Sequence, residues 1–269
     1  MRSLLKYTNT FMLALQASIE YRIDFILSII SGLFIVIVQC SLWTAVFNSS
    51  NSMVIYGYTY QEMMIYSIFS GIVSKLVATG FENEIADDIK SGGLSKYITQ
   101  PMNYKYYRFC KFVGGKVMQM LIVTLLLFIS MLFFVFKWSF QIDAFSIITF
   151  FISIVLGLVL NFCIFFLVSQ LAFRMTEVWG VFIAVNQGSY LLSGGVFPLD
   201  VFGENVYRIV HLLPFEYTVF FQINIINGHL EKHQILDGLL IQLIWILILS
   251  ALGEVCWKKG LKKYVAVGN

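Results

Sequence analysis

The chain has 269 residues, of which 59% are hydrophobic and 12% are charged. Soluble domains average about 45–50% apolar and about 25% charged residues, so this composition excludes a water-soluble globular domain and favours a membrane protein. A net charge of +3, without a basic cluster, does not indicate a nucleic-acid partner. The four cysteines lie far apart in the sequence, which argues against a disulfide framework or a zinc site.

Six apolar runs are long enough to cross a bilayer as helices, for which about 20 residues are needed. They are residues 25–47, 63–81, 117–136, 144–173, 178–199 and 238–256. We therefore predict an all-α membrane protein with six transmembrane helices, formed by residues 1–269 as a single transmembrane domain.

The distribution of Lys and Arg between the flanking segments predicts the orientation of these helices. One set of flanks holds thirteen basic residues: Arg2, Lys6, Arg22, Lys90, Lys96, Lys105, Arg108, Lys111, Arg174, Lys258, Lys259, Lys262 and Lys263. The opposite set holds three: Lys137, Arg208 and Lys232. Because basic residues are retained on the cytoplasmic side, we expect both termini in the cytoplasm.

Two further segments have patterns of their own. Residues 1–22 place apolar side chains at helical spacing among polar ones, which predicts an amphipathic helix lying in the membrane interface. Residues 198–236 form the longest outer segment, and the apolar stretch 217–227 within it is too short to cross the bilayer. We expect this segment to be re-entrant or interfacial and to precede the last span.

The longest cytoplasmic loop, residues 82–111, begins with a pattern typical of a short helix over residues 82–90. Glu82 and Glu84 favour the positive end of a helix dipole, and Ile85 and Ile89 form an apolar stripe. The glycine pair 92–93 is typical of a helix end. Such a helix could insert into a groove on a soluble partner, or it could belong to a solvated loop whose charges serve solubility.

The order of these features resembles the permeases of the ABC-2 class of ATP-driven exporters. The loop pattern is similar to theirs in Glu84-Ile85, Asp88-Ile89, the Gly92-Gly93-Leu94 turn, Pro101 and Asn103. The run 193–199, Ser-Gly-Gly-Val-Phe-Pro-Leu, and the sequence Leu213-Pro214-Phe215 followed by Gly228 are similar to their outer segment. Gln222 stands in the region where such permeases often have a second proline.

The resemblance implies partners and roles. It implies docking of the loop on a separate ATP-binding subunit, present in two copies, beside a second permease that is identical or related. The expected docking residues are Glu82, Glu84, Ile85, Asp87, Asp88, Ile89, Lys90, Gly92, Gly93, Leu94 and Pro101. The expected outer gate consists of Gly194, Gly195, Pro198, Pro214 and Phe215. The implied location is a bacterial plasma membrane.

The sequence offers no ATP site of its own. A phosphate-binding loop needs Gly-x-x-x-x-Gly-Lys followed by Ser or Thr, whereas Gly115-Lys116 is followed by Val117 and preceded by Cys110 in place of the first glycine. ATP and magnesium are therefore expected in the partner subunit. No catalytic residue or cofactor is expected in this chain. His229 and His233 share a helix face but have no third ligand near in sequence, so we expect no metal site.

Five polar residues within the apolar runs are candidates for a translocation path: Lys75, Asn161, Gln170, Asn186 and Gln187. An intramembrane charge such as Lys75 indicates function by default, although this lysine could instead pair with an acidic residue such as Glu82 or Glu84. The amides could equally serve as hydrogen-bonding links between helices.

Two other classes of protein remain as alternatives. An ion-gradient-driven secondary transporter or channel should show inverted repeats, broken spans and several buried ionisable groups. A membrane enzyme should show a nucleophile, an acid pair or a metal-binding set near a headgroup. The sequence has one charge deep in a span, no repeat and no such set, so it favours the exporter, and its Phe-rich spans favour an amphipathic cargo.

Overall fold

The computed structural model describes residues 2–20, 22–50, 52–100, 102–138 and 143–264. The described elements are helical apart from a small antiparallel hairpin, β1 (Val54–Ile55) and β2 (Tyr58–Thr59). The prediction of an all-helical membrane protein is confirmed.

Within the described residues, five helical stretches are long and apolar enough to cross a membrane: Ile30–Ser49, Tyr60–Lys90, Tyr104–Phe134, Ala144–Phe173 and Lys232–Leu261. Their helices are α2 (Arg22–Ser49), α3 (Tyr60–Val77) with α4 (Phe81–Lys90), α6 (Tyr104–Trp138), α7 (Ala144–Ser169) with the 3-10 turn η1 (Gln170–Phe173), and α11 (Lys232–Leu261).

The remaining predicted span, residues 178–199, contains α8 (Trp179–Leu192), which has 14 residues. At about 1.5 Å per residue this helix is roughly 21 Å long, less than the ~30 Å hydrocarbon core of a bilayer. It is therefore not among the five long candidates.

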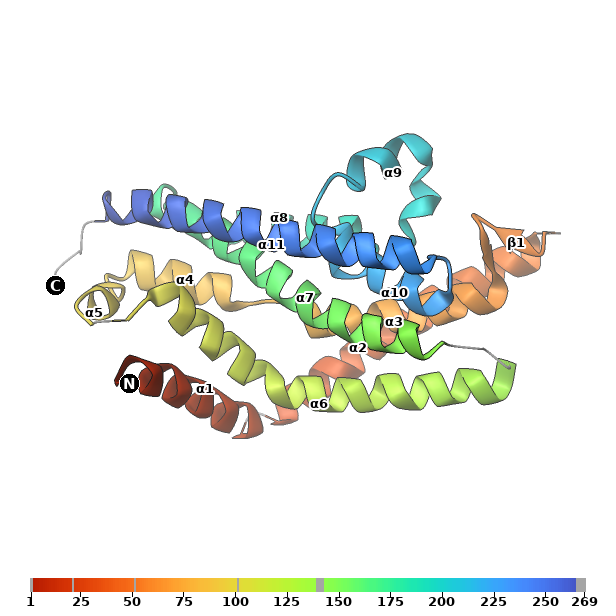
Figure 1. The fold of residues 1–269 in the computed structure, drawn as a ribbon, viewed down its shortest axis with the longest axis horizontal. Coiled ribbons are helices and arrows are strands. Elements are labelled where there is room, and N and C mark those ends of the chain that lie inside the picture. The colour runs from red at the N-terminus through yellow and green to blue at the C-terminus, as the bar shows by residue number, and fades with distance from the viewer. Residues whose placement is uncertain (1, 21, 51, 101, 139–142, 265–269) are drawn as a thin grey trace.

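The helices form an elongated array (Figure 1). The N-terminal helix α1 (Arg2–Glu20) packs on α6, α2 packs on α3, and α11 packs on α7. The start of α1 and the end of α11 lie at the same end of the molecule as α4 and α5 (Ser95–Ile98), and the β hairpin lies at the opposite end (Figure 1). The two ends of the molecule therefore differ in composition, and the end that contains α4 and α5 is rich in lysine and arginine.

The long stretch Tyr60–Lys90 is interrupted at residues 78–80. It starts with a capping box, in which the Thr59 amide donates to Glu62 Oε2 at 2.8 Å and Thr59 Oγ1 accepts from the Glu62 amide. The helix ends at Val77 because Ala78 is extended, with a ψ of 142°. The chain resumes as α4 three residues later.

Side chains from neighbouring helices bind the carbonyl groups that this break releases. Gln119 Nε2 on α6 donates to the Lys75 carbonyl at 2.7 Å, and Asn161 Nδ2 on α7 donates to the Val77 carbonyl at 2.6 Å. An unsatisfied carbonyl in apolar surroundings costs several kcal/mol. The break is therefore a built feature of the fold, supported from two sides.

The segment 198–236 is folded into short helices: η2 (Leu199–Phe202), α9 (Glu204–Val210), η3 (Glu216–Thr218) and α10 (Phe220–Asn227). Every residue of α10 is buried, and the helix packs on α3 and α7. With eight residues, about 12 Å, it is too short to cross a bilayer.

A buried amide cluster ties this segment to the long helices. Gln222 Nε2 on α10 donates to the carbonyls of Ser153 and Tyr217 at 3.2 and 2.8 Å. Gln242 Nε2 on α11 donates to the same two carbonyls at 3.1 and 2.7 Å. Because both amides are fully buried, these bonds fix α7, α10 and α11 relative to one another.

Two adjacent glycines of α6 provide a test of how α1 is held. A Cβ added at Gly114 would lie 2.5 Å from the Phe11 carbonyl oxygen, whereas one added at Gly115 would meet nothing within 4 Å. Gly114→Ala should therefore push α1 off α6, and Gly115→Ala should not. Both changes raise helix propensity equally, so the difference reports packing alone.

Limited proteolysis of the N-terminal segment in lipid nanodiscs measures this. We expect cleavage within residues 2–20 of Gly114→Ala to be roughly tenfold faster than in the parent, in line with an overpacking cost of about 1–3 kcal/mol. Equal cleavage of the two variants would contradict the packing of α1 on α6.

Candidate functional site

One face of helix α4 packs against the rest of the chain, and the opposite face is exposed. Ile85 and Ile89 are 0% and 7% exposed, and Glu82 is 2% exposed. The apolar stripe that suggested a partner groove thus faces the interior of this chain. Asn83, Asp87 and Lys90 are exposed on the opposite side.

A tight turn follows α4 and is closed by bonds within the loop. Gly92 adopts a φ of +76°, which favours glycine. The Leu94 amide donates to the Asp88 carbonyl at 2.7 Å, and Ser91 Oγ donates to the Asp87 carbonyl at 2.6 Å. Leu94 itself is fully buried, Gly93 is half-buried, and the predicted docking residue Pro101 lies outside the described residues.

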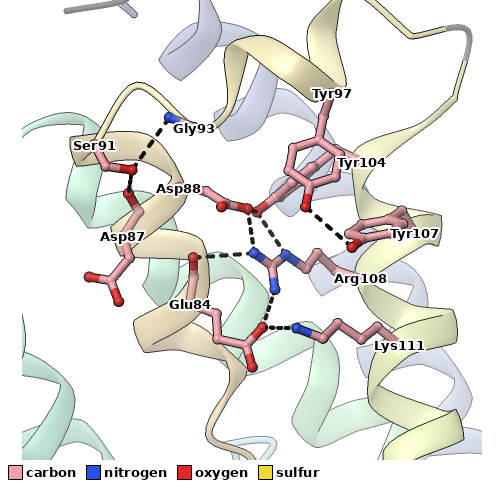
Figure 2. Close-up of polar contacts among 10 residues, drawn as sticks. All are labelled: Glu84, Asp87, Asp88, Ser91, Gly93, Tyr97, Tyr104, Tyr107, Arg108 and Lys111. Carbon is pink, nitrogen blue, oxygen red and sulfur yellow. Dashed lines mark hydrogen bonds and ion pairs between the residues drawn. The ribbon is translucent and has the colours of Figure 1, made fainter. Parts of the chain in front are cut away.

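Arg108 on α6 joins α4 to α6 (Figure 2). Its Nη1 donates to Glu84 Oε2 and its Nη2 donates to Asp88 Oδ2 and, at 3.2 Å, to the Glu84 carbonyl. Its Nε donates to the Tyr104 hydroxyl at 2.8 Å, and that hydroxyl donates to Asp88 Oδ2 at 2.7 Å. Lys111 Nζ adds a contact to Glu84 Oε2 at 2.5 Å.

The burial of Arg108 makes this cluster strong. Its side chain is 3% exposed, against 48% for Glu84 and 15% for Asp88. Removing one partner of a buried ion pair costs about 3–5 kcal/mol, whereas an exposed pair contributes about 0–1 kcal/mol. Lys111, which is 44% exposed, therefore adds much less than Arg108.

Further contacts extend the cluster to α8 and α11. The ring of Tyr104 stacks on Trp257 of α11 with centroids 4.9 Å apart, and Lys105 Nζ donates to Ser250 Oγ at 2.5 Å. Asn186 Nδ2 of α8 donates to Glu82 Oε1 at 3.0 Å. Helix α4 thus contacts α6 and α8 directly, and Tyr104 and Lys105 of α6 connect the cluster to α11.

Sequence reasoning counted Arg108 and Lys111 only as positive charges of the loop. A signal for their role was present: Glu84 and Asp88 are four residues apart on one helix, and Arg108 and Lys111 are three residues apart on the next. Such spacings place each pair on one helix face, so the two faces are electrostatically complementary.

Comparison with protein-family models decides the family. The model described as ABC-2 family transporter protein matches residues 33–268. The chain belongs to this family. No curated protein and no solved structure matches it. The interpretation of the sequence as an ABC-2 permease is confirmed.

The candidate path residues of the permease lie in different places. Asn161 and Asn186 line one small cavity of about 80 Å³ beside the break in Tyr60–Lys90, together with Ser74 and Ser189. Gln170 Nε2 instead donates to the Gly253 carbonyl of α11 at 3.1 Å. Gln187 is exposed on α8.

Lys75 lies close to the backbone of α2. A Cβ added at Gly32 would be 3.0 Å from Lys75 Cε, so this glycine makes room for the lysine stem. Of the two acids considered as its partners, Glu84 pairs with Arg108 and Lys111, and Glu82 Oε1 accepts from Asn186.

The candidate gate residues lie on two turns that meet the core. Gly194 has a φ of +78°, and its carbonyl accepts a bond of 2.6 Å from the buried Tyr66 hydroxyl. A Cβ at Gly195 would be 2.3 Å from the Tyr190 ring. Pro198 directly precedes η2, and Pro214-Phe215 directly precede η3, whose first residue is Glu216.

Glu216 pairs with His211, with 2.9 Å between Oε2 and Nδ1. The hydrogen bond to Glu216 raises the pKa of the His211 imidazole above its usual value, against an opposing effect of burial. Tyr207 and Tyr217 contact the same imidazole ring through their own rings, and burial together with the charge of Glu216 raises the pKa of both hydroxyls.

The His211–Glu216 pair predicts a pH-dependent stability. Because the folded-state pKa of His211 is raised, its contribution is complete below about pH 6.5, the unfolded value, and is lost as pH rises through the folded value. The imidazole is 49% exposed, so we expect a melting temperature lower by less than about 3 °C at pH 8.5 than at pH 6.0.

Thermal unfolding of His211→Asn should lack this component of the pH dependence. His233→Asn is the matched control, because His233 is 69% exposed beside Glu231. An identical pH profile for the parent and His211→Asn would contradict the pairing.

Proposed function

We propose that the chain is the membrane-spanning permease subunit of an ATP-driven exporter, moved by a separate ATP-binding subunit. The observation that carries this proposal is the construction of α4. Its outer face, formed by Asn83, Asp87 and Lys90, is exposed, while its inner face is bound to α6 through the buried Arg108. A docking element needs both an accessible surface and a rigid attachment.

The docking surface is the exposed part of the set indicated by family resemblance, Glu84, Asp87 and Lys90, together with the half-buried Gly92 and Gly93 of the adjoining turn. The buried members Glu82, Ile85, Ile89 and Leu94 hold the helix in place from within. Asp88 serves the attachment, because it accepts from both Arg108 and Tyr104.

Force on α4 would reach the transmembrane helices along these contacts. Closure of two ATP-binding subunits pushes α4, Arg108 passes the displacement to α6, and the Tyr104–Trp257 stack passes it to α11. The bond from Asn186 to Glu82 connects α8, so the small cavity beside Asn161 changes shape in the same movement. ATP and magnesium are bound by the partner.

In this proposal α8 and the turn after it form the sixth transmembrane segment. Both termini face the cytoplasm, and the segment 198–236 re-enters from outside as the gate. The common location of the start of α1 and the end of α11 (Figure 1), together with the basic residues at that end, supports this orientation. Helix α1 lies in the cytoplasmic interface, and a second permease completes the pore in a bacterial plasma membrane.

A gradient-driven transporter is the second candidate, because broken spans also occur in that class. In such proteins the carbonyls released at the break coordinate the transported ion or substrate. Here Gln119 and Asn161 occupy the released carbonyls of Lys75 and Val77. This difference favours the ATP-driven permease.

Reversing the charge of Asp87 tests the docking role. Asp87→Lys places a cation near the C-terminus of α4, where the helix dipole favours it, so the helix should remain folded. We expect cargo-stimulated ATP hydrolysis by the reconstituted transporter to fall at least about tenfold. This corresponds to a loss of ~1.4 kcal/mol in the free energy of binding between α4 and the ATP-binding subunit. Co-purification of the ATP-binding subunit should weaken in parallel.

Glu204→Lys is the matched control, since Glu204 is 76% exposed on α9 and pairs only with the exposed Arg208 among the contacts described. It should leave ATP hydrolysis unchanged. Normal stimulated hydrolysis in Asp87→Lys, or full transport by the purified chain without any ATP-binding subunit, would refute the proposal.

A further inference from the structure

The segment 198–236 lines a second, larger cavity together with Tyr58 of β2 and the first turns of α11. It has a volume of about 460 Å³ and lies between α9, η3, α10 and the start of α11, where Figure 1 shows α9 standing off the bundle. This volume is within the range of about 300–1,000 Å³ typical of small-molecule sites. None of the candidate gate residues lines it.

Aromatic rings form much of the wall. Tyr207 contacts His211 and Phe220 with centroids 5.7 and 6.1 Å apart, and Tyr217 contacts Phe221 at 5.7 Å. The raised pKa values of Tyr207 and Tyr217 keep their hydroxyls protonated, so these rings stay uncharged. Neutral tyrosine rings attract cations placed over their faces.

Acidic groups outnumber basic ones in the wall. Asp200, Glu216 and Asp237 line the cavity with His211 and His229, and neither Lys nor Arg is among its described lining residues. Glu216 is 4% exposed and pairs with His211, so its carboxylate is available to another cation where the imidazole is neutral, and Asp237 is exposed on α11. A concave surface lined by one sign of charge concentrates ions of the opposite sign.

The spacing of the acids discriminates between kinds of cation. No group of three His, Cys, Asp or Glu side chains in the described part of the chain is close enough to hold a metal ion. The carboxylates are instead distributed around an aromatic space. That arrangement suits a bulky cation with diffuse charge, which aromatic walls recognise well, and it disfavours an uncharged acyl chain.

We propose that this cavity is a binding site for an organic cation of the alkylammonium class. Glu216 and Asp237 supply the charge that attracts the ligand, and Tyr207 and Tyr217 supply the faces on which its alkyl groups rest. The site is separate from α4, and its occupancy requires neither nucleotide nor the ATP-binding subunit. In an exporter it would lie on the exit side and would mark the cargo as cationic.

Equilibrium dialysis of radiolabelled tetraethylammonium against the purified chain in lipid nanodiscs tests the site without ATP. We expect saturable binding of tetraethylammonium. At a constant protein concentration, an excess of sodium chloride should reduce this binding only slightly. Glu216→Gln should weaken binding at least about tenfold, since a charge is lost from a poorly solvated site. Tyr217→Leu should weaken it roughly threefold to tenfold.

Asp237→Asn changes an exposed position, where the substitution should not disturb folding. It therefore tests cation binding by the cavity even if Glu216→Gln fails to fold. It should weaken binding by about threefold to tenfold. Glu204→Gln, an acid of the same segment outside the cavity, is the control and should bind like the parent. Absence of saturable binding, unchanged binding in the three cavity variants, or an equal loss in Glu204→Gln would overturn the proposal. None of these results bears on ATP-driven coupling, which is measured with the partner present.

Discussion

Arg108 carries a permanent positive charge at a position that water scarcely reaches, and the arrangement of α4 and α6 follows from its neutralisation. A buried guanidinium requires acceptors around its whole fork. Glu84 and Asp88 of α4 and the Tyr104 hydroxyl of α6 itself provide them, so the two carboxylates have to come from a surface that faces α6 at this point. The charge of Arg108 thereby holds one face of α4 against α6, and the opposite face of α4 stays exposed.

The break in Tyr60–Lys90 makes this arrangement possible. A continuous helix would carry Glu84 and Asp88 onward along the axis of α3, whereas the extended Ala78 redirects the chain before α4 begins. The carbonyls of Lys75 and Val77 released at the break are bound by Gln119 and Asn161, so the redirection leaves these two groups satisfied. The same break borders the small cavity that contains Asn186, the residue that holds Glu82.

Much of this fold could be predicted from apolar runs, because about 20 consecutive apolar residues have few alternatives to a membrane-crossing helix. The short helix after the second run was also predictable from its acids, its Ile85–Ile89 stripe and its glycines. The direction of that stripe was not, because periodicity shows that a helix has an apolar face without showing what covers it. The length of α8 was hidden because apolar turn residues continue its run beyond Leu192.

The polar contacts were the least predictable part. Gln222 and Gln242 meet on the carbonyls of Ser153 and Tyr217, four positions brought together only by the packing of α7, η3, α10 and α11. The role of Arg108 could have been predicted by matching the helix face that carries it with the face that carries Glu84 and Asp88. Its burial, however, follows only from the tertiary structure. The aromatic and acidic residues around the cavity of about 460 Å³ likewise come from six separate elements: β2, η2, α9, η3, α10 and α11.

Whether α4 and α6 move as one body is the central question, and a distance measurement answers it most directly. Spin labels at Ser91 and at the exposed Tyr106 would report their separation in the reconstituted transporter, after replacement of Cys40, Cys110, Cys163 and Cys256. We expect this distance to stay constant when ATP binds, and the same in Lys111→Leu. In Arg108→Leu it should broaden or shift on ATP binding. A nucleotide-driven change in the parent, or an unchanged distance in Arg108→Leu, would contradict the account.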